Sequence, residues 1–249
     1  MPTPFMHIAA AHRFLHDAQV SDAIKSHLED SVNLGAFLLG NVAPDARVSG
    51  GLDRAQTHFF EYAAKVDQRP EDALFAAHPE PKTANGQRRA FVAGYLAHLA
   101  MDVVWAEDLL YPYFYYQEDW GDRWIRFNML HVLLCYLDAR DYRQWGEHYP
   151  QALATARPHE WVSFLSDEDI CIWRDVIAEQ ICSGCENQTL EVLGRRVKIG
   201  KEGLREILEN PNRMQAELWD YVPQMAVAQV EVNMYDAMVT QIVSYLSNS

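Results

Sequence analysis

The fifteen residues from Gly94 to Asp108, "GYLAHLAMDVVWAED", decide how the rest of the chain must be arranged. The stretch is mostly apolar, and its apolar residues recur at helical spacing, which predicts a helix buried in the core. His98 and Asp102 nevertheless stand four residues apart within it, and Asp108 follows. Residues at positions i and i+4 project from the same face of a helix. The sequence therefore predicts a core helix that presents an imidazole and a carboxylate side by side.

The composition is that of a folded protein with an acidic surface. The chain has 249 residues, of which 49% are hydrophobic and 22% are charged, and its formal net charge is −14. Such a balance does not predict disorder. It argues against binding to duplex nucleic acid or to an anionic membrane, because both require a cationic surface. Small anionic substrates stay possible, because bound metal cations would reverse the local field.

Nearly every other segment also has helical periodicity, and no segment alternates convincingly as a strand would. We therefore expect an all-α protein, a single multi-helix bundle domain over residues 1–249. Its first half, residues 1–145, contains most of the histidines, so a chemical site is expected there; residues 146–249 form a helical C-terminal half. Within the first half we expect one helix from Ser21 to Gly40 and then a long irregular stretch.

The sequence predicts a cytoplasmic protein with no transmembrane segment. The N-terminus lacks a basic stretch followed by an apolar run, and no segment has the uninterrupted apolar length that a membrane span needs. The four cysteines are accordingly expected to be reduced. Cys182 and Cys185 form a CxxC pair, but no second pair accompanies them, so two ordinary cysteines are expected here. The sequence leaves the oligomeric state open.

Further potential metal ligands lie outside the opening stretch. His7 lies in "FMHIAAAHRF", Asp45 lies in "GNVAPD" and His58 lies in "THFF". Each of them alone is more often structural than functional. Together with His98 and Asp102 they supply three imidazoles and two carboxylates, a ligand set that suits a pair of divalent metal ions.

These motifs, in this order, resemble those of the zinc-dependent phospholipase C and single-strand-specific zinc nuclease superfamily, which consists of all-α phosphodiesterases with a three-zinc cluster. The resemblance covers roughly the first 140 residues and rests on the short motifs "MHIAAAHRFL", "GNVAPD", "THFF" and "YLAHLAMD". It implies that the chain binds two or three Zn²⁺ ions, and that the ligands include His7, Asp45, His58, His98 and Asp102.

The third zinc site departs from the family pattern. Where the family has a histidine ten residues after the first ligand of the His-x-x-x-Asp helix, this chain has Asp108. The next family motif is a histidine followed four residues later by an acidic residue; here His131 is followed at that distance by Cys135, and Asp138 lies one turn further on. The resemblance thus implies a third set of Asp108, His131 and either Cys135 or Asp138. A changed metal, a weaker site and an empty site are all open.

Family members also use their mature N-terminal amine as a metal ligand. If Met1 is removed from this chain, Pro2 stands five residues before His7, which is close to the spacing in the nucleases. Pro2 is therefore a hypothetical ligand, and an ordinary N-terminus is the alternative.

The resemblance implies hydrolysis of a phosphoric ester, with Asp45 orienting or deprotonating the attacking water as well as binding metal. The expected substrate is a small phosphodiester or a phospholipid. One alternative is an HD-type metal phosphohydrolase, which the dipeptide His16–Asp17 suggests. The other is a non-enzymatic helical protein with a vestigial, structural metal site.

Overall fold

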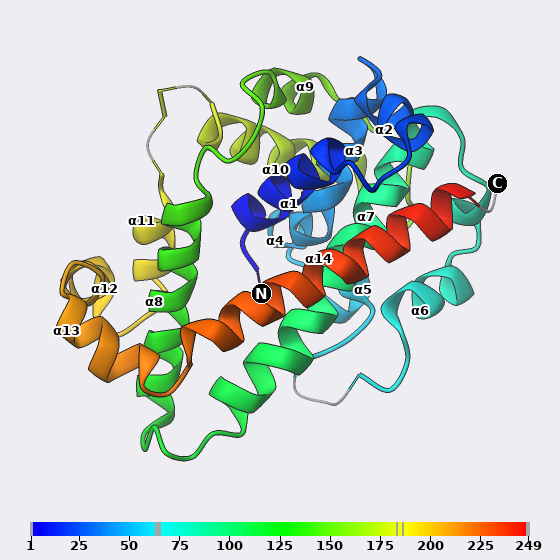
Figure 1. The fold of residues 1–249 in the computed structure, drawn as a ribbon. Coiled ribbons are helices and arrows are strands. Elements are labelled where there is room, and N and C mark those ends of the chain that lie inside the picture. The colour runs from blue at the N-terminus through cyan, green and yellow to red at the C-terminus, as the bar shows by residue number, and fades with distance from the viewer. Residues whose placement is uncertain (1, 63–65, 183, 186, 248–249) are drawn as a thin grey trace.

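A computed structural model of the chain describes residues 2–62, 66–182, 184–185 and 187–247 (Figure 1). Within these ranges the chain forms helices and no strand, which confirms the all-α prediction. The helices of the first half are α1 (Pro4–His16), α2 (Asp22–Glu29), α3 (Asn33–Val42), η1 (Ala43–Ala46), α4 (Arg47–Gly50), α5 (Arg54–His58), α6 (Pro70–Ala77), η2 (Glu80–Thr83), α7 (Gly86–Val104), η3 (Trp105–Tyr115) and α8 (Arg123–Asp141). Those of the second half are α9 (Tyr149–Thr155), α10 (Asp167–Gln180), α11 (Thr189–Gly194), α12 (Gly200–Leu208), α13 (Pro211–Arg213), η4 (Met214–Trp219) and α14 (Gln224–Ser247).

Helices α3 and α7 form the centre of the molecule, and two glycines set how closely they pack. A Cβ atom added to Gly40 of α3 would lie 2.0 Å from the carbonyl oxygen of Phe91, and one added to Gly94 of α7 would lie 2.2 Å from that of Phe37. Only glycine permits so close an approach of two backbones. The opening stretch is therefore buried as predicted over most of its length, against the backbone of α3 as well as against side chains, while Glu107 and Asp108 at its end are exposed.

The hydrophobic core extends through both halves of the sequence. Helix α14 packs along α7, while α9 and α10 cover α3 and η1 from the other side (Figure 1). A single cluster of buried apolar side chains contains Phe37 and Leu99 from the first half and Leu153 and Ile242 from the second. The second half thus completes the same core that the first half begins.

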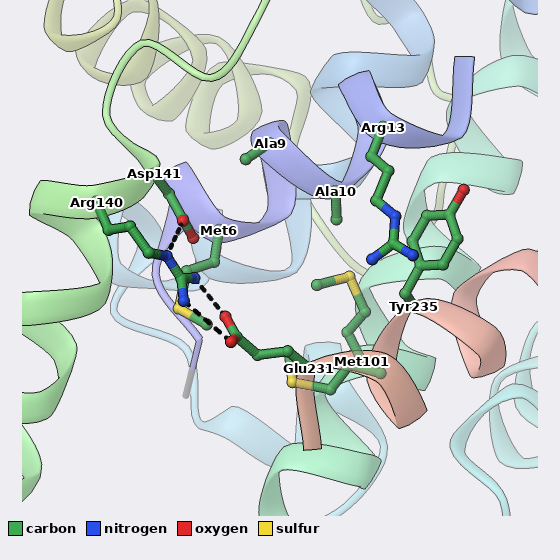
Figure 2. A pocket seen from close by; sticks show the side chains of 10 residues that line it. Met6, Ala9, Ala10, Arg13, Met101, Arg140, Asp141, Glu231 and Tyr235 are labelled. Atoms are coloured by element: carbon green, nitrogen blue, oxygen red, sulfur yellow. Dashed lines mark hydrogen bonds and ion pairs between the residues drawn. The ribbon is translucent and has the colours of Figure 1, made fainter. Parts of the chain in front are cut away.

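Helix α8 connects the centre to a peripheral group of helices. It contacts α1 as well as α11, α12 and η4, which lie beside it at one end of the molecule (Figure 1). Figure 2 shows the junction of α1, α8 and α14 around a cavity of about 160 Å³, where the guanidinium of Arg140 binds Glu231 and Asp141. Beside it, the guanidinium of Arg13 lies 3.6 Å from the ring centre of Tyr235. The Arg140–Glu231 ion pair thus links α14 to α8, and the Arg13–Tyr235 contact links α14 to α1.

Two helix boundaries in the first half differ from the prediction. The helix expected from Ser21 to Gly40 is divided into α2 and α3, because Asp30 has an extended backbone and its carboxylate accepts a hydrogen bond from Val32 N. The stretch expected to be irregular contains η1, α4 and α5. Gly51 ends α4 with a φ of 67°, a left-handed conformation that glycine adopts readily.

The helix around the opening stretch extends beyond Asp108. It continues from α7 into the π-helical segment η3, which contains Pro112 and ends at Tyr115. In the second half, Cys182 and Cys185 are joined by a disulfide, so the expectation that these two cysteines are reduced was wrong. None of the described helices is both long and apolar enough to span a membrane.

Candidate metal centre

Four helices bring five of the predicted ligands together at the centre of the molecule. Their donor atoms form two groups, each with all atoms within 4.8 Å of one another, and both groups contain His98. All five residues are at most 3% exposed. One group consists of His7, His98 and Asp102, and the other consists of Asp45, His58 and His98.

Local structure explains how the loop ligands reach this cluster. The 3₁₀ helix η1 follows α3 directly and carries Asp45 beneath the end of α3. The short helix α5 ends with His58, and Phe59 then adopts a left-handed backbone with a φ of 61°. The N–H of Phe59 donates to the carbonyl of Ala55, as in a helix C-cap. A left-handed non-glycine residue is unusual and is often found beside functional groups.

Hydrogen bonds to the backbone and to a hydroxyl fix two of the imidazole rings. His98 donates from Nδ1 to the carbonyl oxygen of Asn41 at 2.8 Å, so its Nε2 faces the cluster. His58 Nδ1 lies 2.9 Å from Thr57 Oγ1, and the Thr57 hydroxyl is placed to donate to the carbonyl of Arg54. Such contacts set the tautomer and the orientation of metal-binding histidines. Both rings are therefore held with an Nε2 lone pair available inside the cluster.

The distances between donor atoms fit a divalent ion better than direct hydrogen bonding. His58 Nε2 lies 3.6 Å from Asp45 Oδ1 and 3.5 Å from Asp102 Oδ2, and His7 Nε2 lies 3.6 Å from Asp102 Oδ1. Zinc–ligand bonds of roughly 2.0–2.1 Å at tetrahedral angles separate two ligands by about 3.3 Å. Moreover, both ring nitrogens of His7, Asp45 Oδ1 and Asp102 Oδ1 have no hydrogen-bond partner within the described ranges. Buried polar atoms without partners are costly, so these residues fit a metal ion.

The charge state of the cluster also suits metal binding. Burial lowers the pKa of His7 to about 4, and burial together with the Arg54 guanidinium lowers that of His58 well below its ordinary value. Burial opposes ionisation of Asp102, but His98 and Arg54 hold its pKa well below the usual range. Burial opposes protonation of His98, but Asp102 and Asp45 raise the pKa of this imidazole. The cluster therefore offers an ionised Asp102 carboxylate and the neutral imidazoles of His7 and His58, which are the protonation states that bind metals.

None of the residues predicted for a third site joins either group of potential ligands among the described residues; these are Asp108, His131, the buried free Cys135 and Asp138. Asp108 is exposed and accepts a hydrogen bond from Asn233 at 2.9 Å. His131 is buried, and its Nδ1 donates to the carbonyl of Phe127 at 2.7 Å. Asp138 accepts hydrogen bonds from the hydroxyls of Thr3 and Thr189. The described part of the chain thus assembles two groups that share one histidine, and no third group.

A cavity of about 500 Å³ lies next to the cluster and reaches the surface. Asp45 belongs to both the cluster and the wall of this cavity, and His131 and Asp138 line it as well. The wall is largely apolar, and it also carries Arg47 and Arg196. Ligand sites in proteins commonly combine an apolar wall with a few polar groups in a space of this size.

Asp138 supports a prediction about pH. Burial raises the pKa of Asp138 to about 7, although two hydroxyls donate to it. In the unfolded chain this pKa is near 3.8, so the folded protein binds the proton more tightly. Stability should therefore decrease as the pH rises from about 4 to about 7, by an amount on the order of 4 kcal/mol.

Unfolding by urea in EDTA, at several pH values between 4 and 8, would measure this effect. The wild type should lose stability across the range relative to Asp138→Asn, which cannot ionise. Parallel pH profiles for the two proteins would contradict the prediction, and they would mean that Asp138 is already ionised when folded.

Sequence reasoning missed several residues of the cluster. Arg54 is 8% exposed, and its Nη2 lies 2.5 Å from Asp102 Oδ2. Tyr62 points its hydroxyl at the same oxygen, at 3.5 Å. One sequence feature could have indicated that Arg54 lies near the cluster: it stands four residues before His58, which places both on one face of a helix. No sequence feature indicates that the carbonyl of Asn41 binds His98, because only the packing of α3 on α7 brings the two together.

The dipeptide of the HD alternative lies outside the cluster. His16 is exposed, and its Nδ1 contacts the carbonyl of His12. Asp17 accepts a hydrogen bond from the hydroxyl of Tyr235. Neither residue belongs to a group of potential metal ligands in the part of the chain that the structure describes.

Comparisons with known proteins identify no relative of this chain. No protein family, no curated protein and no solved structure matches the chain.

Proposed function

We propose that the chain is a metal-dependent phosphoric ester hydrolase, similar in its ligand set to the zinc-dependent phospholipase C and nuclease superfamily. One observation supports this above all. Five buried ligand residues from four helices converge with donor atoms 3.3–3.7 Å apart, and one of them, Asp45, also lines a cavity. A purely structural cluster has no need of such an opening.

The residues of the cluster have distinct roles in this proposal. His7, His98 and Asp102 would hold Zn²⁺, which when bound would lower the pKa of a coordinated water and offset negative charge on a phosphate. Burial raises the pKa of Asp45, which improves its carboxylate as a proton acceptor. Because Asp45 lies between the cluster and the cavity, it orients the attacking water and accepts its proton.

The cavity wall indicates the class of substrate. Apolar side chains dominate it, which favours a phosphodiester with an apolar group, such as a phospholipid, over a highly polar ester. Arg47 and Arg196 are the cationic groups of the wall, and they are suited to a phosphate oxygen. A small phosphodiester or a phospholipid is therefore the proposed substrate, with the apolar part in the cavity.

Metal content and hydrolysis, measured together on the same preparations, test the proposal. Wild type purified without tag or chelator should retain divalent metal by mass spectrometry, and should hydrolyse bis(p-nitrophenyl) phosphate or a short-chain phospholipid. His98→Gln should lower the metal affinity by more than about 100-fold, because a ligand and its fixed geometry are lost. It should also abolish hydrolysis.

His12→Gln is the matched control, because His12 lies on α1 outside the cluster, with its Nδ1 3.1 Å from the hydroxyl of Tyr149. It should keep both metal and activity. Bound metal without hydrolysis of any phosphodiester would favour the non-enzymatic alternative, in which the ion is structural. No bound metal in the wild type would refute both.

A further inference from the structure

The two carboxylate oxygens of Asp102 have different surroundings. Oδ2 lies 2.5 Å from Arg54 Nη2 and 3.5 Å from the hydroxyl of Tyr62. Oδ1 has no hydrogen-bond partner within the described ranges and lies 3.6 Å from His7 Nε2. A cation already occupies one side of Asp102, therefore, while the other side is available to a ligand.

The guanidinium of Arg54 is held in this position by packing. Its carbon Cζ lies 4.0 Å from the ring centre of Tyr62 and 4.8 Å from that of Phe60. The side chain is 8% exposed, and a buried guanidinium is stable only when a carboxylate pairs with it. Arg54 is thus a fixed structural component of the cluster.

The ligands can serve two ions only if Asp102 bridges them. His98 has one nitrogen available, because its Nδ1 donates to Asn41, so it serves a single ion. One ion would take His7, His98 and Asp102 Oδ1. A second ion would take Asp45 and His58. The nearest other donor to His58 Nε2 is His98 Nε2 at 3.3 Å, which the first ion already uses, and the next is Asp102 Oδ2 at 3.5 Å. That oxygen is the one that binds Arg54.

The net charge of the cluster also limits it to one divalent ion. Asp45 and Asp102 together with Arg54 give the cluster a net charge of −1 when both carboxyls are ionised. One divalent ion changes this to +1, whereas two would bury a net +3 among side chains that are almost fully enclosed. Burying unpaired charge is strongly unfavourable.

We propose that Arg54 takes the place of a second metal ion, so that the cluster binds a single divalent ion through His7, His98 and Asp102 Oδ1. This inference rests on the proposed metal-dependent function and narrows it. Arg54 supplies a fixed positive charge where a second ion would lie. Asp45 and His58 are then left without a metal ion, on the side of the cavity. The predicted count of two or three zinc ions becomes one.

Zinc stoichiometry tests this inference without any assay of activity. Each protein is saturated with zinc, desalted and analysed by mass spectrometry. Wild type should hold one ion per chain. Arg54→Met removes the charge but keeps the aliphatic stem against Phe60 and Tyr62, and it should hold two, because Asp102 Oδ2 becomes available to bridge. Arg54→Lys keeps the charge and should hold one.

Arg47→Met is the matched control, since Arg47 lines the cavity without contacting Asp102, and it should hold one ion. Two or three ions in the wild type, or one in a folded Arg54→Met, would overturn the role of Arg54 and leave the metal-dependent function standing. No ion in the wild type would instead overturn the proposed function itself.

Stability provides a second readout in case Arg54→Met folds poorly without metal. Its Asp102 carboxylate then lacks a counter-charge until a second ion binds. Zinc should therefore raise the thermal midpoint of Arg54→Met more than that of the wild type. An equal or smaller rise would count against the inference.

Discussion

Replacing Gly94 by alanine is expected to lower the free energy of unfolding by roughly 3 kcal/mol or more. The added methyl would lie 2.2 Å from the carbonyl oxygen of Phe37 and 2.9 Å from the backbone nitrogen of Asn41. Both are backbone atoms of α3, so no side-chain rotation relieves the clash and the two helices must separate. Alanine gains about 1 kcal/mol of helix propensity over glycine, which is too little to compensate.

The same substitution should also weaken the metal centre. Asn41 accepts the hydrogen bond that fixes His98, so moving α3 away from α7 releases this imidazole. Urea unfolding in EDTA measures the first effect, and zinc titration measures the second. Gly50→Ala is the control, because the atoms nearest to its methyl would be those of the Asp169 carboxylate, a side-chain group that can move. A Gly94→Ala protein as stable as Gly50→Ala would refute the close packing of α3 on α7.

The fold class could be predicted from the sequence because it depends on periodicity. The apolar residues of α7 recur at helical spacing, and Ser166, which caps α10, is followed by three acidic residues in its first turn. Helix boundaries in the first half were harder to predict. The break at Asp30 depends on one local hydrogen bond, and η3 continues past Pro112 as a π-helix, which a rule for α-helices does not anticipate.

The candidate site was predicted in part for a related reason. His98 and Asp102 share a helix face, and their burial follows from the apolar residues around them. Asp108 lies six residues beyond Asp102, where the chain has become π-helical, and its side chain is exposed. Arg54 could not be recognised as a partner of Asp102 from sequence, because the two are 48 residues apart and meet only in the folded chain. Metal binding by the five clustered residues stays a prediction.

Removing Asp102 is expected to have the largest effect at the centre. Asp102→Ala should abolish metal binding and also lower the free energy of unfolding by about 3–5 kcal/mol in EDTA, where no metal contributes. The reason is that the Arg54 guanidinium would be left buried without its carboxylate. Folded proteins have only about 5–15 kcal/mol of stability in total, so this variant should be only marginally folded.

A double variant separates the two consequences. Arg54→Met/Asp102→Leu removes both charges and replaces them with apolar groups, so it should recover most of the stability lost in Asp102→Ala while still failing to bind zinc. Excess zinc at about 1,000 times its dissociation constant should stabilise the wild type by about 4 kcal/mol and the double variant by nothing. Urea unfolding of Arg54→Met, Asp102→Leu and the double variant, with and without zinc, gives the coupling between Arg54 and Asp102. If the effects of the two substitutions on the free energy of unfolding simply add in EDTA, Asp102 and Arg54 do not stabilise each other, and the inferred role of Arg54 is wrong. If they do not add, the guanidinium is the resident cation of the cluster, and the protein folds around it before any metal arrives.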